Sequence, residues 1–232
     1  MKIVKFKGGL GNQMFQYAFL KLLQEKMPAE IVKGDLFWYG DNNDNVQKSR
    51  ILGMQVDIDF ANKEEIKKIC YLNHNEKVRT KKYRIKVFIE ALINYNYFFE
   101  RDRSYREIDS LLNYIYYDGY WQSWRYLEPV REKLILDFRP RQVLSELSQN
   151  AIEQYKKKNS VFVGVRRGDY LKDSRARKHY GVSDPMYYKK AVEYIRNRVE
   201  EPTFIFFSDD IVWVKKYITP QYLGIQKEYI EY

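Results

Sequence analysis

The chain has 232 residues, 41 of them basic and 31 acidic, and hydrophobic residues make up 45% of it. Such a chain can bury one large core or two small ones, and its formal charge of +10 favours an anionic partner. A single cysteine excludes an internal disulfide and a Cys-x-x-Cys metal or redox pair. The sequence shows no signal-peptide core and no apolar run of about 18 residues, so we expect a cytoplasmic protein, free or peripheral on the inner membrane face.

A strand, a glycine turn and a helix are predicted at the start of the chain. Residues 3–6 read as a short strand, and apolar residues repeat at helical spacing over residues 14–23. The turn between them, Lys7-Gly8-Gly9-Leu10-Gly11, departs from G-x-G-x-x-G because a methionine occupies the third glycine position. Two interpretations stay open. Backbone N–H groups at the helix start, with Asn12 and Gln13, hold a sugar or phosphate, or the glycines only permit a tight turn.

The middle of the chain, residues 30–115, is mixed, and residues 63–115 look mainly helical. Residues 76–86 carry six basic side chains against one acidic, and an apolar and aromatic run follows over residues 87–99. The pattern favours a helix with one solvated basic face, and contact with an anionic lipid surface is the alternative. Nucleic acid is not an expected partner, because no RNP, KH or helix-turn-helix signature accompanies the charge.

Asp57-Ile58-Asp59 matches the D-x-D pattern of metal-dependent sugar transfer. A pattern of two carboxylates arises often by chance, and the apolar residues around it alternate as in an exposed strand. The sequence therefore favours the strand interpretation, and no metal or other cofactor is expected.

Residues 160–218 alternate between strands and helices. Residues 161–165 and 203–207 are continuous apolar runs that predict buried strands, and Asp184-Pro185 predicts the start of the helix between them. Strand, helix and strand in this order indicate a right-handed parallel unit. The predicted fold class is therefore α/β.

Polar residues follow both strands at the sheet edge where α/β folds bind ligands. Arg166, Arg167 and Asp169 follow the first strand, and alternation predicts that only one of the two arginines meets a ligand such as a diphosphate. A structural Arg–Asp pair is the alternative. Ser208-Asp209-Asp210 follows the second strand and either caps a helix or contacts ribose hydroxyls or a purine edge.

Taken together, several segments resemble glycosyltransferase family 11, the bacterial and animal α-1,2-fucosyltransferases. These segments are the opening KFKGGLGNQMFQYAF, the GYWQS segment at residues 119–123, VRRGDYL, DPMYY and FFSDDIVWVKK. The resemblance implies a GT-B-like fold with two Rossmann-type lobes. The pattern of elements along the chain divides it into two α/β lobes joined by a helical connection (116–158). The resemblance makes the first (1–115) an acceptor-side lobe with a helical insertion and the second (159–232) a partial nucleotide-sugar lobe.

The resemblance also implies a reaction and a set of site residues. L-fucose would pass from GDP-fucose to the 2-hydroxyl of a galactoside, in an oligosaccharide or a lipid-linked glycan, with inversion and without a metal. Arg166 would bind the β-phosphate, supported by Arg167 and Asp169, and Asp209 would approach the nucleoside. The other implied donor-site and cleft residues are Tyr170, Ser208 and Asp210, and Gly9, Gly11, Asn12 and Gln13.

The sequence departs from the family pattern at two places that bear on the expected activity and on the expected second lobe. Gly164 stands where the pattern has a histidine, so that imidazole has no counterpart in this chain. The family's later Asn-Ser-(Ser/Thr)-Phe-Ser-Trp-Trp segment is not in this sequence, so the second lobe is expected to be short or incomplete. A catalytically impaired nucleotide- or sugar-binding relative and a basic membrane-surface module are the alternative functions. Asp169 and Asp57 are the candidates for the general base.

Overall fold

The computed structural model describes residues 1–39, 49–71, 81–102, 104–168, 184–219 and 226–231. The chain forms two compact units, Met1–Val143 and Leu144–Tyr232, and each is built on its own parallel sheet. This confirms the predicted α/β class. The first unit extends past residue 115, and the predicted helical connection does not begin at residue 116, because a strand of the first sheet lies there.

The elements of the first unit are, in chain order, β1 (Lys2–Lys5), α1 (Leu10–Lys26), β2 (Val32–Asp35), η1 (Phe37–Tyr39), η2 (Arg50–Gly53), α3 (Lys63–Ile69), α4 (Lys81–Ile93), β3 (Tyr97–Phe99), η3 (Ile108–Leu111), β4 (Tyr116–Asp118), α5 (Trp124–Leu127), η4 (Glu128–Val130) and α6 (Arg131–Asp137). Those of the second unit are α7 (Glu146–Lys156), β5 (Ser160–Val165), α10 (Pro185–Arg196), β6 (Thr203–Ser208), α11 (Ile211–Trp213), the π-helical η5 (Val214–Ile218) and β7 (Gln226–Glu231).

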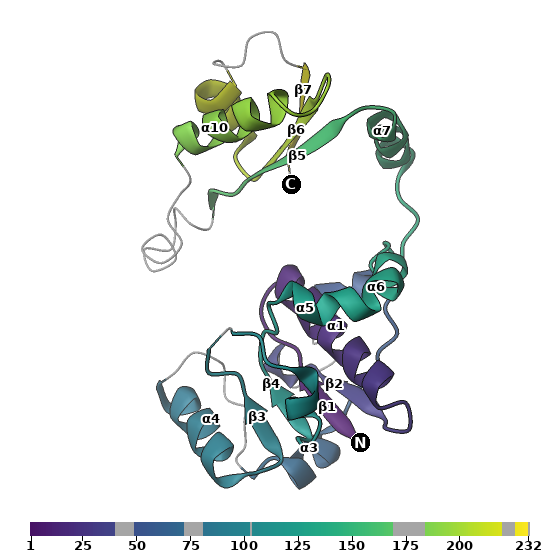
Figure 1. The fold of residues 1–232 in the computed structure, drawn as a ribbon, viewed down its shortest axis with the longest axis vertical. Helices are drawn as coiled ribbons and strands as arrows, with labels where there is room; N and C mark the ends of the chain where they lie inside the picture. The colour runs from purple at the N-terminus through teal and green to yellow at the C-terminus, as the bar shows by residue number, and fades with distance from the viewer. Residues whose placement is uncertain (40–48, 72–80, 103, 169–183, 220–225, 232) are drawn as a thin grey trace. The chain divides into compact units, whose positions relative to one another are not determined.

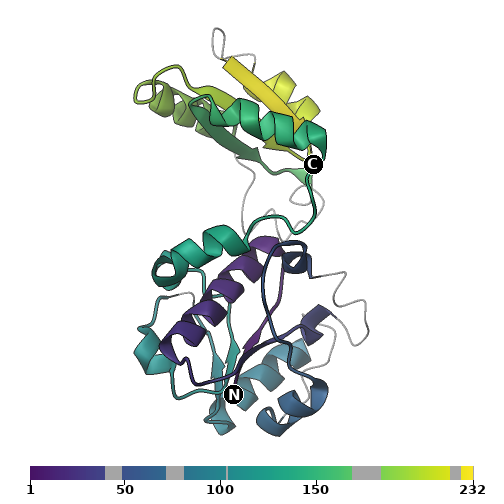
Figure 2. The ribbon, with the colours of Figure 1, turned by 90° about the vertical axis from the view of Figure 1, so that its right-hand side faces the viewer.

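The first sheet has the strand order β2-β1-β4-β3 and is covered on both faces. Ile3 pairs with Tyr116 and faces one core, which α3 and α4 complete, whereas Val4 pairs with Tyr117 and faces the core formed with α1 and α5. Figure 1 shows these helices on opposite sides of the sheet, and Figure 2 shows α1 running across the strands. Strands buried on both faces explain why the central strands are apolar at successive positions.

Two elements of the first unit differ from the predictions. Strand β3 lies in the stretch predicted to be mainly helical, where Tyr97, Phe98 and Phe99 pair with β4. Asp57-Ile58-Asp59 lies outside any strand, and both carboxylates are exposed while Ile58 packs on the core.

In the described part of the chain, no helix has both the length and the hydropathy to cross a membrane.

The second sheet has the order β5-β6-β7, with β6 in the centre. The predicted start of α10 is confirmed, because Asp184 Oδ1 accepts a hydrogen bond of 2.8 Å from Met186 N and Pro185 is the first helical residue. Residues of α10, α11 and η5 pack on one face of this sheet. On the opposite face the rings of Phe162 and Phe207 contact each other with centroids 4.7 Å apart, and Phe162 is 69% exposed.

Candidate active site

The glycine turn of the first unit joins the carboxyl end of β1 to the start of α1. Gly8 has φ +83°, and a Cβ added there would lie 2.4 Å from Asn12 Nδ2, so only glycine fits this position without strain. Gly9 and Gly11 have ordinary φ values, and an added Cβ would meet nothing within 4 Å. Gly9 is the N-cap of α1, and no described side chain caps the helix. The backbone at the helix start therefore borders open space.

Two buried glutamines hold this turn from within the core. Gln13 Nε2 donates to Gly8 O (3.1 Å), and its Oε1 accepts from Ile51 N (2.9 Å). Gln16 accepts from Lys7 N (3.0 Å) and donates to Lys7 O (3.2 Å) and Gly119 O (3.3 Å). Gln13 is only 1% exposed, so it braces the turn and does not line a cleft as the resemblance implied. Gly9 and Gly11 are exposed, as a lining role requires.

The segment at residues 119–123 reaches the same turn. Gln122 Nε2 donates to Asn12 Oδ1 at 2.7 Å. The preceding residue, Trp121, has φ +57°, which is strained for a bulky side chain, but its ring is buried and stacks on Phe19 with centroids 3.8 Å apart. Burial of the indole therefore stabilises the backbone conformation that precedes Gln122.

A buried ion cluster lies at the carboxyl ends of β1 and β4. Asp118 forms ion pairs with Lys5 Nζ (3.1 Å) and Lys7 Nζ, and it accepts a hydrogen bond from the hydroxyl of Tyr97 (2.7 Å). Burial would raise the pKa of Asp118, but the two ammonium groups and the hydrogen bonds hold it well below its usual range. Lys7 also lies over the ring of Tyr120, 4.6 Å from its centroid. The cluster fixes Lys7, the first residue of the glycine turn.

A second buried carboxylate, Asp35, lies at the end of β2. It accepts hydrogen bonds from the Tyr116 hydroxyl and from Phe37 N (2.7 Å). Burial raises the pKa of Asp35, and the nearby Lys5 opposes that shift. Sequence reasoning missed both buried carboxylates. The only available signal was the basic residues Lys5 and Lys7 among apolar ones, which does not reveal that their partner Asp118 lies more than a hundred residues away.

In the second unit, Arg166 and Arg167 follow β5 and differ in their surroundings. Arg166 is exposed. The side chain of Arg167 is 15% exposed, its Nε is 3.3 Å from Asp210 Oδ2, and its guanidinium lies over the Trp213 ring, 3.6 Å from the centroid. Strand β5 ends at Val165, before both arginines, so strand alternation does not set their directions, and Arg167 is distinguished by its packing on Asp210 and Trp213.

The carboxylates that follow β6 hold the loop that follows β5. Asp209 accepts hydrogen bonds from Arg167 N (2.9 Å) and Gly168 N (2.8 Å) through its two oxygens. A Cβ added at Gly168 would lie 2.8 Å from Asp209 Oδ2, so this glycine permits the close approach. These contacts favour a structural role for Asp209 over contact with a nucleoside.

Asp210, not Ser208 or Asp209, is the helix cap after β6. It accepts a hydrogen bond from Trp213 N (3.1 Å) at the start of α11. Ser208 is buried, and its hydroxyl donates to Val165 O (2.8 Å) and accepts from Asp210 N (2.9 Å). Ser208 therefore ties β6 to the end of β5, directly before Arg166.

Other predicted residues lie elsewhere. Asp169 and Tyr170 are outside the described residues. Asp57, the second candidate base, is exposed, and its backbone N–H donates to the hydroxyl of Tyr17 (3.4 Å). Gly164 is exposed on β5, and a Cβ there would lie 3.0 Å from the ring of Phe162. Among the described residues, no group of three or more His, Cys, Asp or Glu side chains could hold a metal ion.

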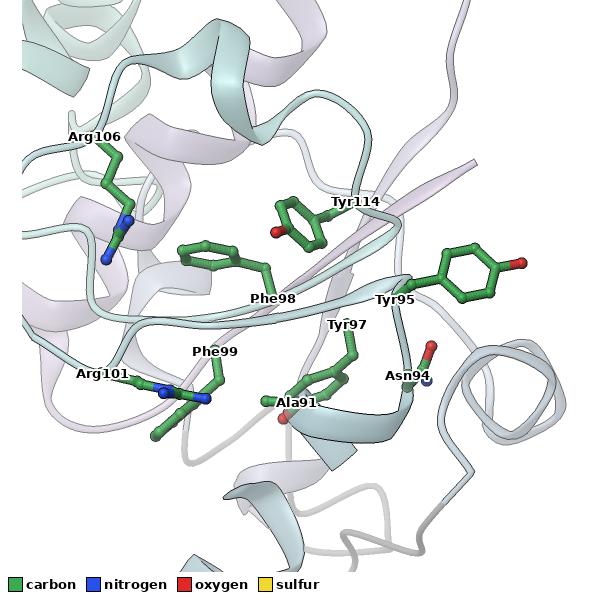
Figure 3. Close-up of a pocket in the computed structure, with 9 residues that line it drawn as sticks. All are labelled: Ala91, Asn94, Tyr95, Tyr97, Phe98, Phe99, Arg101, Arg106 and Tyr114. Carbon is green, nitrogen blue, oxygen red and sulfur yellow. The ribbon is translucent and has the colours of Figure 1, made fainter. Parts of the chain in front are cut away.

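A pocket of about 350 Å³ lies at the edge strand β3 of the first unit. Figure 3 shows Arg106 and Tyr114 beside Phe98, whereas Arg101 extends along Phe99 toward Ala91 at the end of α4. Sequence reasoning identified none of these residues as site residues. The pocket combines aromatic rings with two guanidinium groups.

Each unit has a parallel strand that ends in a polar loop: the central strand β1 leads to the glycine turn before α1, and the edge strand β5 leads to Arg166. These features define an α/β protein with parallel sheets, a fold class that binds ligands at the carboxyl ends of its strands. The chain matches Glycosyl transferase family 11 over residues 1–226. It belongs to this family and is thereby a glycosyltransferase.

Named relatives support the assignment. The O-antigen biosynthesis glycosyltransferase WbnK of Escherichia coli is 28% identical over 97% of this chain and 78% of its own length. An alpha-1,2-colitosyltransferase of Escherichia coli is 31% identical over 93% of this chain and 71% of its own length. The galactoside 2-alpha-L-fucosyltransferase Sec1 of Mus musculus is 31% identical over 51% of this chain and 33% of its own length. No solved structure matches the chain.

Proposed function

We propose that the protein transfers L-fucose from GDP-fucose to the 2-hydroxyl of a galactoside, with inversion and without a metal. The names of two relatives support the linkage, because one is an alpha-1,2-colitosyltransferase and the other a galactoside 2-alpha-L-fucosyltransferase. The acceptor is an oligosaccharide or a lipid-linked glycan.

The exposed Arg166 at the carboxyl end of β5 carries this proposal. As the glycosidic bond breaks, negative charge accumulates on the leaving diphosphate, and a fixed cation that meets this charge lowers the barrier. Arginine suits the task because its guanidinium is always charged and binds phosphate through two parallel hydrogen bonds. Arg167 and Asp209 fix the backbone directly after Arg166, so less entropy is lost when the diphosphate binds.

The glycine turn of the first unit is the proposed acceptor-side element. Its exposed backbone at Gly9 and Gly11 can approach a sugar hydroxyl closely, because no side chain intervenes. Asn12, held by Gln122, places an amide at the same turn.

The direct test is a transfer assay with GDP-fucose and lactose, with and without EDTA, alongside measurement of GDP binding. The proposal expects a 2-linked fucosyl product in both conditions and saturable GDP binding. Loss of transfer with EDTA would contradict the metal-independent mechanism. Neither transfer nor GDP binding would contradict the function altogether.

A nucleotide-binding relative without transferase activity is the second candidate, and Gly164 favours it. The family pattern has a histidine at this position, and the exposed Gly164 leaves room for one, since the adjacent Phe162 ring is itself largely exposed and can move. This candidate expects GDP binding without detectable transfer, and it expects Gly164→His to raise transfer. Efficient transfer by the wild-type protein would exclude it.

A further inference from the structure

The outer face of α4 carries a stripe of large apolar side chains that lie in solvent. They recur at positions i, i+3, i+4, i+7 and i+8, which place them on one side of a helix. Each is between 40% and 60% exposed, and together we call them the α4 stripe: Ile85, Phe88, Ile89, Leu92 and Ile93. Tyr95, just after the helix, is 80% exposed. A continuous exposed apolar surface of this kind marks an interaction site.

The α4 stripe is separate from the face that folds the helix onto the sheet. Val87 is 1% exposed and belongs to the core with Tyr97 and Tyr116. Glu90, the only acidic residue of α4, is fully buried, and it accepts hydrogen bonds from Tyr71 N (2.8 Å) and Asn94 Nδ2 (2.6 Å). The helix is therefore anchored through its inner face, and its outer face is left with no carboxylate of its own.

The sequence of α4 is rich in basic residues. It contains Lys81, Lys82, Arg84 and Lys86. Arg101, from the loop after β3, lies over the ring of Phe88, 5.0 Å from its centroid, and also lines the pocket at the end of α4 (Figure 3). An exposed apolar stripe on a helix whose sequence has four basic residues and one buried acidic residue is typical of a helix that lies in the interface of an anionic bilayer.

We propose that α4 docks this protein on an anionic lipid bilayer, with the α4 stripe inserted at the acyl boundary and basic residues of the first unit, Arg101 among them, at the lipid phosphates. Pairing of two copies through this face is disfavoured, because it would bring basic helices together without acidic partners. Such docking would bring the first unit to a membrane surface. It does not depend on the donor or the reaction proposed above.

The test is sedimentation of the full chain with vesicles of phosphatidylcholine alone or mixed with phosphatidylglycerol. We expect binding to the mixed vesicles only, and loss of binding when NaCl rises from about 0.1 M to 1 M, where the screening length falls from about 10 to 3 Å. The variant Ile89→Gln/Leu92→Gln should weaken binding at least about tenfold, since it removes two inserting side chains.

The matched control is Ile135→Gln/Leu136→Gln, which changes two similarly exposed apolar residues on α6. It should bind mixed vesicles like the wild type, and GDP binding should be unchanged in both variants. Equal binding of both variants to mixed vesicles, or of the wild type to neutral vesicles, would overturn the proposal. A wild-type dimer in analytical ultracentrifugation that the α4 variant converts to a monomer would also overturn it in favour of self-association.

Discussion

The loops that follow β1 and β5 hold their functional groups in different ways. The glycine turn after β1 is braced by buried side chains, Gln13 and Gln16, and its first residue, Lys7, is fixed by Asp118. The loop after β5 is held from one side by Asp209 and leaves Arg166 exposed. The first arrangement presents backbone, which suits sugar hydroxyls, whereas the second presents a charged side chain, which suits a diphosphate. Changes in the first loop should therefore act on stability, and changes in the second on chemistry.

The largest expected effect on stability is that of Asp118→Asn. The substitution leaves Lys5 and Lys7 buried without their carboxylate, so the free energy of unfolding should fall by about 3–5 kcal/mol. Urea unfolding followed by circular dichroism measures this change. Asp109→Asn, which breaks the exposed pair with Lys26 (3.7 Å), is the control and should change stability little. Equal effects of the two substitutions would show that the cluster does not hold the turn.

The largest expected effect on chemistry is that of Arg166→Ala. Removing a preorganised cation from the developing charge should lower kcat about 100- to 1000-fold. Arg198→Ala is the control, because Arg198 follows α10 in the same unit and stacks on Tyr194. If both variants retain full activity in the fucosyl-transfer assay, Arg166 does not contact the leaving group.

At acidic pH, the change of the unfolding free energy with pH should depend on Asp118. Its folded-state pKa is depressed, so its contribution is complete above the unfolded pKa of about 3.9 and is lost as the pH falls below it. The difference in unfolding free energy between wild type and Asp118→Asn should shrink by about 1.4 kcal/mol per pH unit below that value. Asp35, whose pKa is raised, acts in the opposite sense, because protonation relieves the cost of its burial. Urea unfolding between pH 2 and pH 6 measures the difference, and a constant difference would contradict the ion-pair assignment.

The smallest expected effects separate two glycines of the same turn. Gly8→Ala should lower the free energy of unfolding by about 1–2 kcal/mol, because alanine fits the positive φ poorly and its Cβ meets Asn12. Gly11→Ala lies in α1 with open space around its Cβ and should raise stability by about 0.5–1 kcal/mol. It should nevertheless raise KM for the acceptor severalfold. A Gly11→Ala variant with unchanged KM would remove the turn from the acceptor site.

The elements that the sequence predicted correctly are those encoded by short local patterns. The unit of β1 and α1, and the strands β5 and β6 with α10 between them, follow from periodicity and from the Asp184-Pro185 cap. Strand β3 escaped prediction because its three aromatic residues continue the apolar run of the preceding helix. Contacts between residues distant in sequence could not be predicted either. Pairs such as Lys5–Asp118 and Arg167–Asp209 depend on which strands become neighbours.

The roles of the candidate site residues also depend on contacts between distant segments. Strand alternation predicted that only one of the two arginines meets a ligand, but β5 ends at Val165, and the partners of Arg167 come from the segment after β6. The roles of Gln13 and Asp209 depend on donors supplied by distant segments, so spacing alone left both a ligand role and a structural role open.

Calorimetric titration with GDP tests most directly the claim that the exposed arginine after β5 forms the donor site. The account predicts saturable binding by the wild type and by Arg198→Ala, and binding about 10- to 100-fold weaker by Arg166→Ala, as expected for loss of charged hydrogen bonds to phosphate. Equal GDP affinities for the wild type and Arg166→Ala would contradict it.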